Sequence, residues 1–324
     1  MKEVVSQLEE AGSSDRKGIG TYAIDVQNLR KVYSRGNRQR VAVDDLTFQV
    51  PWGTCFGLVG PNGAGKTSTI RVLLGLVRPS SGTCRILGAK PGNELSEVID
   101  EIGVVQEGQG FFPNSSGRDN LAYLALLRGF DKGVIEDVLD VVGLAKAKDL
   151  DFSKYSLGMK QRLGIAAALL KDPKLLIMDE PSNGLDPRGL FELRDIMSAL
   201  RERGKTILLC SHLLSEVQTV CDWIAIISDG VCVATGELAA LLESMGNAAL
   251  LIKIRQKEKA LKLMSASGYL AESAGDAIRV LAPPSDGEKI IRILAKAGIY
   301  PQELRADTSD LEDVFLRLVS KEGH

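Results

Sequence analysis

The stretch Gly60-Pro61-Asn62-Gly63-Ala64-Gly65-Lys66-Thr67 decides the fold of this chain, because it matches the pattern G-x-x-x-x-G-K-[ST] at every fixed position. The apolar segment Cys55-Phe56-Gly57-Leu58-Val59 precedes it and predicts a short buried strand. The segment from Ser68 to Leu76 follows it and predicts a helix. A glycine-rich turn between a strand and a helix directs backbone N–H groups and the helix dipole at an anion. We therefore interpret the stretch as a phosphate-binding loop rather than a chance glycine-rich turn.

The loop residues have expected roles toward the phosphate chain of a nucleotide. Lys66 can reach the β- and γ-phosphates, and Thr67 can hold Mg²⁺ through its hydroxyl. The predicted nucleotide-binding residues of this region are Gly60, Pro61, Asn62, Gly63, Ala64, Gly65, Lys66, Thr67 and Ser68.

A second apolar strand ends in two acids, in the run Lys174-Leu175-Leu176-Ile177-Met178-Asp179-Glu180-Pro181. Asp179 stands at the strand end, where it suits the coordination shell of Mg²⁺. Glu180 comes one residue later, where it suits polarising an attacking water. Acids directly after a buried strand are costly unless a metal or a hydrogen-bond donor satisfies them, which argues against a purely structural role. The sequence therefore predicts Asp179 as a metal ligand and Glu180 as a catalytic residue.

Ahead of this strand lies Tyr155-Ser156-Leu157-Gly158-Met159, followed by Lys160-Gln161-Arg162. With this segment the chain resembles the ABC ATPase family over roughly residues 22–236, in the form typical of bacterial drug and peptide-antibiotic exporters with bacitracin-type ATPases. The family signature is Leu-Ser-Gly-Gly-Gln, which Ser156 and Gly158 match. The resemblance implies that both residues bind the γ-phosphate of a nucleotide held by a second subunit. The positions that depart from the signature are Tyr155, Leu157 and Met159.

Four further positions follow the order of motifs in that family. The resemblance implies that Tyr33 stacks its aromatic face on adenine. It implies that Gln106, after the apolar run 102–105, contacts Mg²⁺ and water, and that His212 contacts the γ-phosphate. Asp186 would be the key acid of a loop that crosses the interface between two subunits. Considered alone, Tyr33 would be an ordinary strand residue and His212 a packing residue. Both assignments therefore depend on the order of the motifs along the chain.

Length and composition limit the classes of protein to which this chain can belong. The 324 residues exceed the usual span of one domain and so predict two. An apolar content of 44% and a charged content of 25% are ordinary for a globular protein, and the net charge of −2 argues against a nucleic-acid partner. The five cysteines include no C-x-x-C pair and are expected to be small buried residues in a reducing compartment.

The chain carries no apolar run near the ~20 residues needed to cross a bilayer, and no secretory signal. A transporter built on it is therefore expected to have separate membrane-spanning permease subunits, with this chain peripheral on the cytoplasmic face of the plasma membrane. Residues 1–21 are expected to be a mostly disordered extension. We interpret the basic side chains before the loop as decoration of a solvated hairpin rather than a binding patch; they are Arg35, Arg38 and Arg40.

The resemblance implies an α/β fold for the first domain, a P-loop NTPase with a RecA-like core and antiparallel β and helical subdomains. Alternating strand and helix patterns after Gly236 predict that a small α+β domain follows it. The nucleotide-binding domain is expected over 22–236, with its helical subdomain at about 110–165, and the accessory domain over 237–324. That last domain closes on a helix after the capping box at 309–312. We expect it to serve packing or dimer stability, with a regulatory ligand site as the alternative. The apolar face of its last helix consists of Leu311, Val314, Phe315, Leu318 and Val319.

The expected function is ATP hydrolysis that powers a type-2 ABC exporter, with ATP and Mg²⁺ as cofactors. Two copies would form a head-to-tail homodimer, with each ATP between Lys66 of one subunit and Ser156 of the other. The alternative is a soluble ABC ATPase acting on a ribosome or a repair complex. Ribosome-acting relatives usually carry two ATPase domains, whereas this chain has one phosphate loop. A small-molecule kinase would leave the signature segment and Asp186 unexplained.

Overall fold

The computed structural model describes residues 21–36, 38–106, 110–129, 133–245, 249–307 and 310–321. The chain divides between Thr235 and Gly236 into two compact units. The N-terminal extension and Ser309 of the capping box lie outside the described residues. In the part of the chain that is described, no helix is both long enough and apolar enough to cross a membrane.

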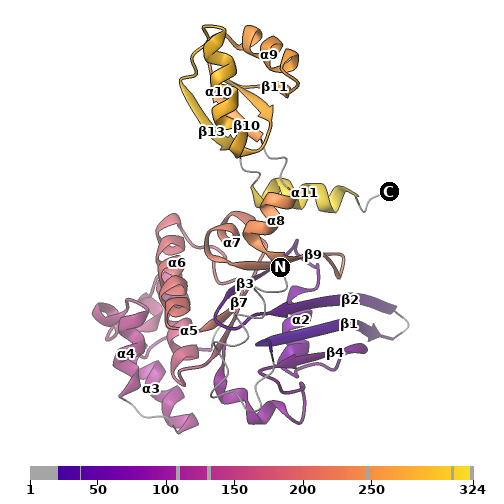
Figure 1. Cartoon of the computed structure of the whole chain (residues 1–324). Helices are drawn as coiled ribbons and strands as arrows, with labels where there is room; N and C mark the ends of the chain where they lie inside the picture. Colours follow the sequence, from indigo (N-terminus) through magenta and orange to yellow (C-terminus); the bar gives the residue numbers. More distant parts are fainter. Residues whose placement is uncertain are drawn as a thin grey trace. The chain divides into compact units, whose positions relative to one another are not determined.

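A six-stranded sheet forms the centre of the first unit, in the order β5-β6-β7-β3-β8-β9 (Figure 1). Its neighbours from β5 to β8 pair in parallel. Every residue of β3 and β7 is buried, as expected for continuous apolar runs in a parallel sheet covered on both faces. The strand predicted over 55–59 is confirmed at its predicted bounds. The strands are β3 (Cys55–Val59), β5 (Ile102–Val105), β6 (Leu175–Asp179), β7 (Thr206–Ser211), β8 (Trp223–Ser228) and β9 (Val231–Glu237).

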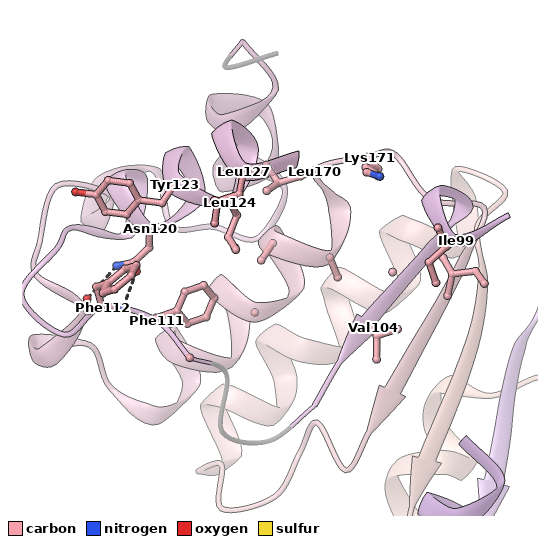
Figure 2. A pocket seen from close by; sticks show the side chains of 16 residues that line it. Ile99, Val104, Phe111, Phe112, Asn120, Tyr123, Leu124, Leu127, Leu170 and Lys171 are labelled. Carbon is pink, nitrogen blue, oxygen red and sulfur yellow. Dashed lines mark hydrogen bonds between the residues drawn. The ribbon is translucent and has the colours of Figure 1, made fainter. Parts of the chain in front are cut away.

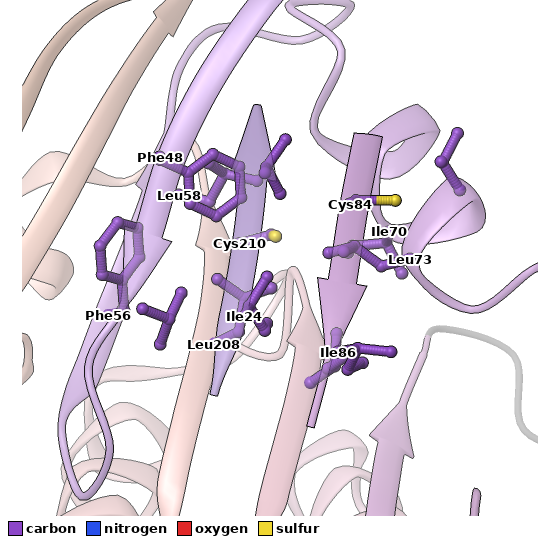
Figure 3. Packing of buried hydrophobic residues seen from close by; sticks show 14 of the residues in the cluster. Ile24, Phe48, Phe56, Leu58, Ile70, Leu73, Cys84, Ile86, Leu208 and Cys210 are labelled. Atoms are coloured by element: carbon purple, nitrogen blue, oxygen red, sulfur yellow. The ribbon is translucent and has the colours of Figure 1, made fainter. Parts of the chain in front are cut away.

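A three-stranded antiparallel sheet lies at one side of this unit and consists of β1 (Ile24–Arg35), β2 (Arg38–Val50) and β4 (Ser81–Ile86). Helix α2 (Lys66–Leu73) joins the two sheets, because Ile70 and Leu73 belong to a buried cluster with residues of both (Figure 3). Phe48 of β2 stacks on Phe56 of β3 with ring centroids 5.5 Å apart. This packing fixes the end of β3 and the start of α2, and therefore the loop between them.

Helices α3 (Gly117–Arg128), α4 (Val134–Val141) and α5 (Leu157–Leu169) contact one another. In Figure 1, α3 and α4 lie at the side of the unit opposite β1, β2 and β4. Helices α3 and α4 lie within the residues 110–165 expected to be helical, and Ala145–Ala147 after them is a 3₁₀ turn. Two further helices, α6 (Pro187–Glu202) and α7 (Leu214–Val220), complete the unit.

The second unit contains a four-stranded antiparallel sheet in the order β11-β12-β10-β13. Strand β11 was not predicted, because its sequence Leu-Ala-Glu-Ser-Ala has no β-branched residue and is mostly exposed. Strand β13 begins at Glu303, and Ile299 ahead of it packs into the core. The strands are β10 (Ala249–Lys253), β11 (Leu270–Ala274), β12 (Ala277–Leu281) and β13 (Glu303–Asp307).

The helices of this unit include α9 (Lys257–Ala266) and α10 (Gly287–Lys296), which contribute to the buried core with the sheet. The remaining two, α8 (Leu238–Met245) and α11 (Leu311–Lys321), contact each other. On α11 the predicted apolar face is partly confirmed. Leu311 and Val314 are fully buried, but Phe315 is only half-buried.

Cysteines are free thiols throughout, and four of the five are buried while Cys232 is half-buried. The sulfurs of Cys55 and Cys221 lie 3.6 Å apart. Burial raises the pKa of the Cys84 and Cys232 thiols to about 11, which leaves them protonated and unreactive near neutral pH. The prediction that the cysteines are small packing residues is confirmed for the four buried ones.

Candidate functional site

Four of the predicted segments meet where the parallel strands of the first unit end. In the strand register Val105 pairs with Met178, so Gln106 comes next to Asp179. Val59 pairs with Ser211, so the phosphate loop starts beside His212. Ligands of open parallel sheets bind outside the carboxyl ends of the strands. The sheet therefore brings together residues that are far apart in the sequence at the edge where a ligand is expected.

The loop between β3 and α2 requires glycine at two positions. A methyl group on Gly60 would lie 2.2 Å from the carbonyl oxygen of Ile227, and one on Gly65 would lie 2.5 Å from that of Ala42. Gly65 also has a φ of +110° at the N-cap of α2, a region that side chains disfavour. The helix starts directly at Lys66, two residues before its predicted start. The backbone N–H groups of its first turn are thus presented to the loop.

Lys66 is buried and satisfied by groups of its own chain. Its ammonium donates to the carbonyl oxygen of Gly60 at 2.6 Å and pairs with Glu180 Oε1 at 3.2 Å. Only 6% of the Lys66 side chain is exposed. A phosphate that binds this ammonium therefore has to compete with the carboxylate of Glu180.

The two carboxylate oxygens of Glu180 contact different residues. Its Oε1 faces Lys66, while its Oε2 lies 2.7 Å from His212 Nδ1 and accepts from the backbone N–H of His212 at 3.3 Å. Glu180 has a φ of +50°, a left-handed conformation that costs a non-glycine residue about 1–2 kcal/mol. Strain of this kind is concentrated at functional sites, because it persists only where the surroundings enforce it.

Asp179 and Thr67 form a donor set that fits a hard divalent cation. The Thr67 hydroxyl donates to Asp179 Oδ2 at 3.1 Å. The second oxygen of Asp179, Oδ1, is buried and has no hydrogen-bond partner among the described residues. Burial raises the pKa of the Asp179 carboxyl, and the hydrogen bond from Thr67 partly offsets this rise. A buried carboxylate oxygen without a donor, beside a hydroxyl, suits Mg²⁺, which prefers oxygen ligands.

A cavity of about 360 Å³ opens over the phosphate loop, and we call it the loop pocket. It includes two cations that the sequence interpretation missed, Arg40 of β2 and Arg71 of α2. Arg40 is exposed on the hairpin of β1 and β2, as expected from the sequence, and it also borders this pocket. The residues that line the loop pocket are Tyr33, Arg40, Ala42, Pro61, Gly63, Gly65, Lys66, Thr67, Ser68, Arg71 and Glu180.

Tyr33 borders the loop pocket as its only aromatic side chain among the lining residues. The ammonium of Lys31 lies 4.8 Å from the centroid of the Tyr33 ring, and it donates to the carbonyl oxygen of Arg78. A cation over an aromatic face is favourable, so this contact holds both the ring and the lysine. A flat base that stacks on Tyr33 is therefore expected at the ring face away from Lys31.

The signature residues do not join the loop pocket of their own chain. They line a separate cavity of about 510 Å³, which we call the signature pocket. Ser156 is the N-cap of α5 and accepts from the backbone N–H of Met159 at 3.2 Å, while Asp186 caps α6 in the same way. The residues of the signature pocket are Ser156, Leu157, Gly158, Met159, Arg162, Gly184, Leu185, Asp186, Arg188, Gly189 and Glu192.

A third cavity, of about 500 Å³, lies between α3, α5 and the β5 edge, and we call it the apolar groove (Figure 2). Asn120 shapes one end, because its side chain exchanges two hydrogen bonds with the backbone of Phe112 at 2.7 and 3.1 Å. The Phe112 ring then meets Tyr123 edge to face. Phe112, Tyr123 and Leu127 are 59%, 45% and 81% exposed. The groove therefore presents a cluster of apolar side chains to the surface.

The fold and the loop pocket together define a P-loop nucleotide hydrolase, and comparisons with known proteins specify its family. The sequence profile of the ABC transporter family matches residues 43–183. The bacitracin transport ATP-binding protein BcrA of Enterococcus faecalis is 36% identical over 94% of this chain and 99% of its own length. The Nod factor export ATP-binding protein I of Mesorhizobium japonicum is 34% identical over 96% of this chain and 91% of its own.

Solved structures agree with this relationship. A structure of an ATP-binding subunit of an ABC transporter is 28% identical and has a TM-score of 0.59, covering 69% of this chain and 93% of its own. The chain therefore belongs to the ABC transporter family, as one of its nucleotide-binding ATPases. The predicted family and the predicted P-loop NTPase fold are both confirmed.

Proposed function

We propose that this chain hydrolyses ATP to power the export of a substrate across the plasma membrane through separate membrane-spanning permease subunits. The observation that carries the proposal is the convergence of Lys66, Glu180 and His212 at the carboxyl edge of the sheet. Relatives that match almost their whole length bear names of bacitracin transport and Nod factor export.

The residues of the loop pocket have distinct tasks in hydrolysis. Lys66 exchanges its contact with Glu180 for oxygens of the β- and γ-phosphates, which frees the Glu180 carboxylate. Glu180 then accepts a proton from the attacking water as general base. His212, already 2.7 Å from Glu180 Oε2, orients that carboxylate and reaches the γ-phosphate. Tyr33 stacks on the adenine, and the loop residues bind the phosphates through backbone N–H groups.

Mg²⁺ would be held by Thr67, Asp179 and Gln106, and when bound it neutralises charge on the phosphates. The buried free oxygen of Asp179 and the Thr67 hydroxyl support this assignment for two of the three residues. The assignment of Gln106 as a ligand is supported only by the strand register, in which Gln106 lies next to Asp179.

We further propose that two copies assemble head to tail and complete each nucleotide site. Gly158 supports this, because a methyl group there would meet its closest neighbours at 3.8 and 3.9 Å, an ordinary contact distance. None of the residues that the structure describes therefore requires a glycine there, whereas a nucleotide held by a partner subunit would. Ser156 and Asp186 would face the same ligand from the signature pocket.

The apolar groove is our proposed docking site for a helix of the membrane subunit. Its exposed aromatic and leucine side chains would lose contact with water when such a helix packs into the groove. This arrangement would hold the chain at the cytoplasmic face of the membrane. The second unit contains none of the candidate site residues, and we assign it an accessory role in packing or dimer stability.

The test is export and complex formation with a candidate membrane-spanning permease, co-expressed with this chain. Lys66→Ala should abolish export, and Leu127→Asp should prevent co-purification while the isolated chain keeps its ATPase activity. Leu76→Asp is the matched control, because Leu76 is 65% exposed but does not line the groove. Export that persists with Lys66→Ala would disprove the proposed function. Unchanged co-purification of Leu127→Asp would disprove the docking site alone.

A further inference from the structure

Arg40 of β2 lies directly opposite Tyr33 of β1 in the antiparallel register. Side chains of directly opposed residues project from the same face of a sheet. Both residues line the loop pocket, and Arg40 approaches its opposite wall, since a methyl group on Gly63 would lie 3.6 Å from Arg40 Nη2. The guanidinium therefore lies beside the middle of the phosphate loop, between the aromatic ring and the loop backbone.

Three other basic groups close to this hairpin and pocket have partners, whereas Arg71 of α2 also lines the pocket. Arg30 pairs with Asp44 at 3.1 Å, the Lys31 ammonium donates to the carbonyl oxygen of Arg78 at 2.8 Å, and Lys66 pairs with Glu180. Arg40 is exposed and makes neither an ion pair nor a hydrogen bond with any residue that the structure describes. A guanidinium without an anion thus borders a cavity built to bind one.

We infer that Arg40 binds the nucleotide through the phosphates closest to the ribose, across the loop pocket from Lys66. This inference rests on the proposed function, which places adenine on Tyr33 and the γ-phosphate between Lys66 and Glu180. A group located between Tyr33 and Gly63 then reaches the phosphates shared by ATP and ADP rather than the terminal one. Guanidinium donors match two phosphate oxygens at once, which makes arginine well suited to this contact.

The experiment measures equilibrium binding of ATP, ADP and adenosine to the full chain and its Arg40→Ala variant. Arg40→Ala should weaken ATP and ADP binding by a similar factor of about 10- to 100-fold, the scale of one charge-assisted hydrogen bond, and leave adenosine unchanged. Arg40→Lys should recover part of the loss. Because the contact is between exposed charges, binding by the unaltered chain should also depend more steeply on salt than binding by Arg40→Ala.

Arg38→Ala is the matched control, since Arg38 is an exposed arginine two residues away on β2 that does not line the loop pocket. It should bind all three ligands as the unaltered chain does. Unchanged ATP binding by Arg40→Ala would overturn the inference, while loss of binding in Lys66→Ala would still support the proposed function. An equal loss of adenosine binding would overturn the phosphate assignment, because the guanidinium would then act on the base. Failure of the unaltered chain to bind ATP would overturn the proposed function itself.

Discussion

The loop pocket and the signature pocket differ in whether neighbouring residues of the same chain dictate the residue types that line them. In the loop pocket, Gly60 and Gly65 are glycines because neighbouring carbonyl oxygens leave no space for a methyl group. Lys66 there is buried and paired with Glu180. In the signature pocket, Gly158 has space for a methyl group, and Ser156 is exposed.

Contacts within the chain set the residue types of the loop pocket, and we attribute those of the signature pocket to contacts with a ligand or a partner. A residue type that its own surroundings dictate serves folding as well as function, so its replacement affects both. Where no described neighbour dictates the residue type, we attribute it to a ligand or a partner, so its replacement is expected to affect function alone. Three predictions use this distinction, in order of the expected size of the effect.

Glu180→Gln should slow ATP hydrolysis by ~10²-fold or more, the scale of a lost general base, without loss of ATP binding. Binding should instead become tighter, because Lys66 no longer has to leave a carboxylate before it contacts phosphate. ATP turnover and nucleotide affinity of the purified protein test both parts. Glu202→Gln is the control, since Glu202 is exposed at the end of α6 and lines neither pocket. A Glu180→Gln protein with most of its turnover would exclude the general-base role.

Replacement of one glycine in each pocket tests the comparison directly. Gly60→Ala should lower the free energy of unfolding by about 1–3 kcal/mol, because its methyl group overlaps the Ile227 carbonyl oxygen. Gly158→Ala should change it by less than about 0.5 kcal/mol, yet reduce ATP turnover by about 10- to 100-fold through misplacement of the partner's nucleotide. Chemical denaturation and ATPase assays on both variants provide the readouts. Equal destabilisation by the two changes would remove the distinction between the pockets.

Mixing two inactive variants should restore part of the activity. Lys66→Ala damages the loop pocket and Ser156→Arg damages the signature pocket, so a mixed dimer has one doubly altered site and one intact site. With free exchange, activity should return to about a quarter of the normal value, because half of the dimers are mixed and each has one intact site. A mixture of Lys66→Ala with the unaltered chain calibrates the exchange. Full activity in a strictly monomeric preparation would contradict the composite site.

The second unit shows which structural features the sequence patterns could not predict. Helix α11 begins at Leu311, within the capping box predicted at 309–312, because a capping box is a local property of the sequence. Strand β11 was missed, since its pairing with β12 rather than its own residue types makes it a strand. Phe315 likewise follows the predicted apolar face of α11, but only the tertiary packing decides that it is half-buried.

The sequence by itself determined the phosphate loop, the strand and helix around it, and the order of motifs that identifies the family. These features depend on residues that are adjacent in the chain, so their spacing can be read directly. Only the tertiary structure decided that Lys66 pairs with Glu180 and that Arg40 borders the loop pocket. Each of these depends on strand register and side-chain reach between distant segments, which no local pattern specifies.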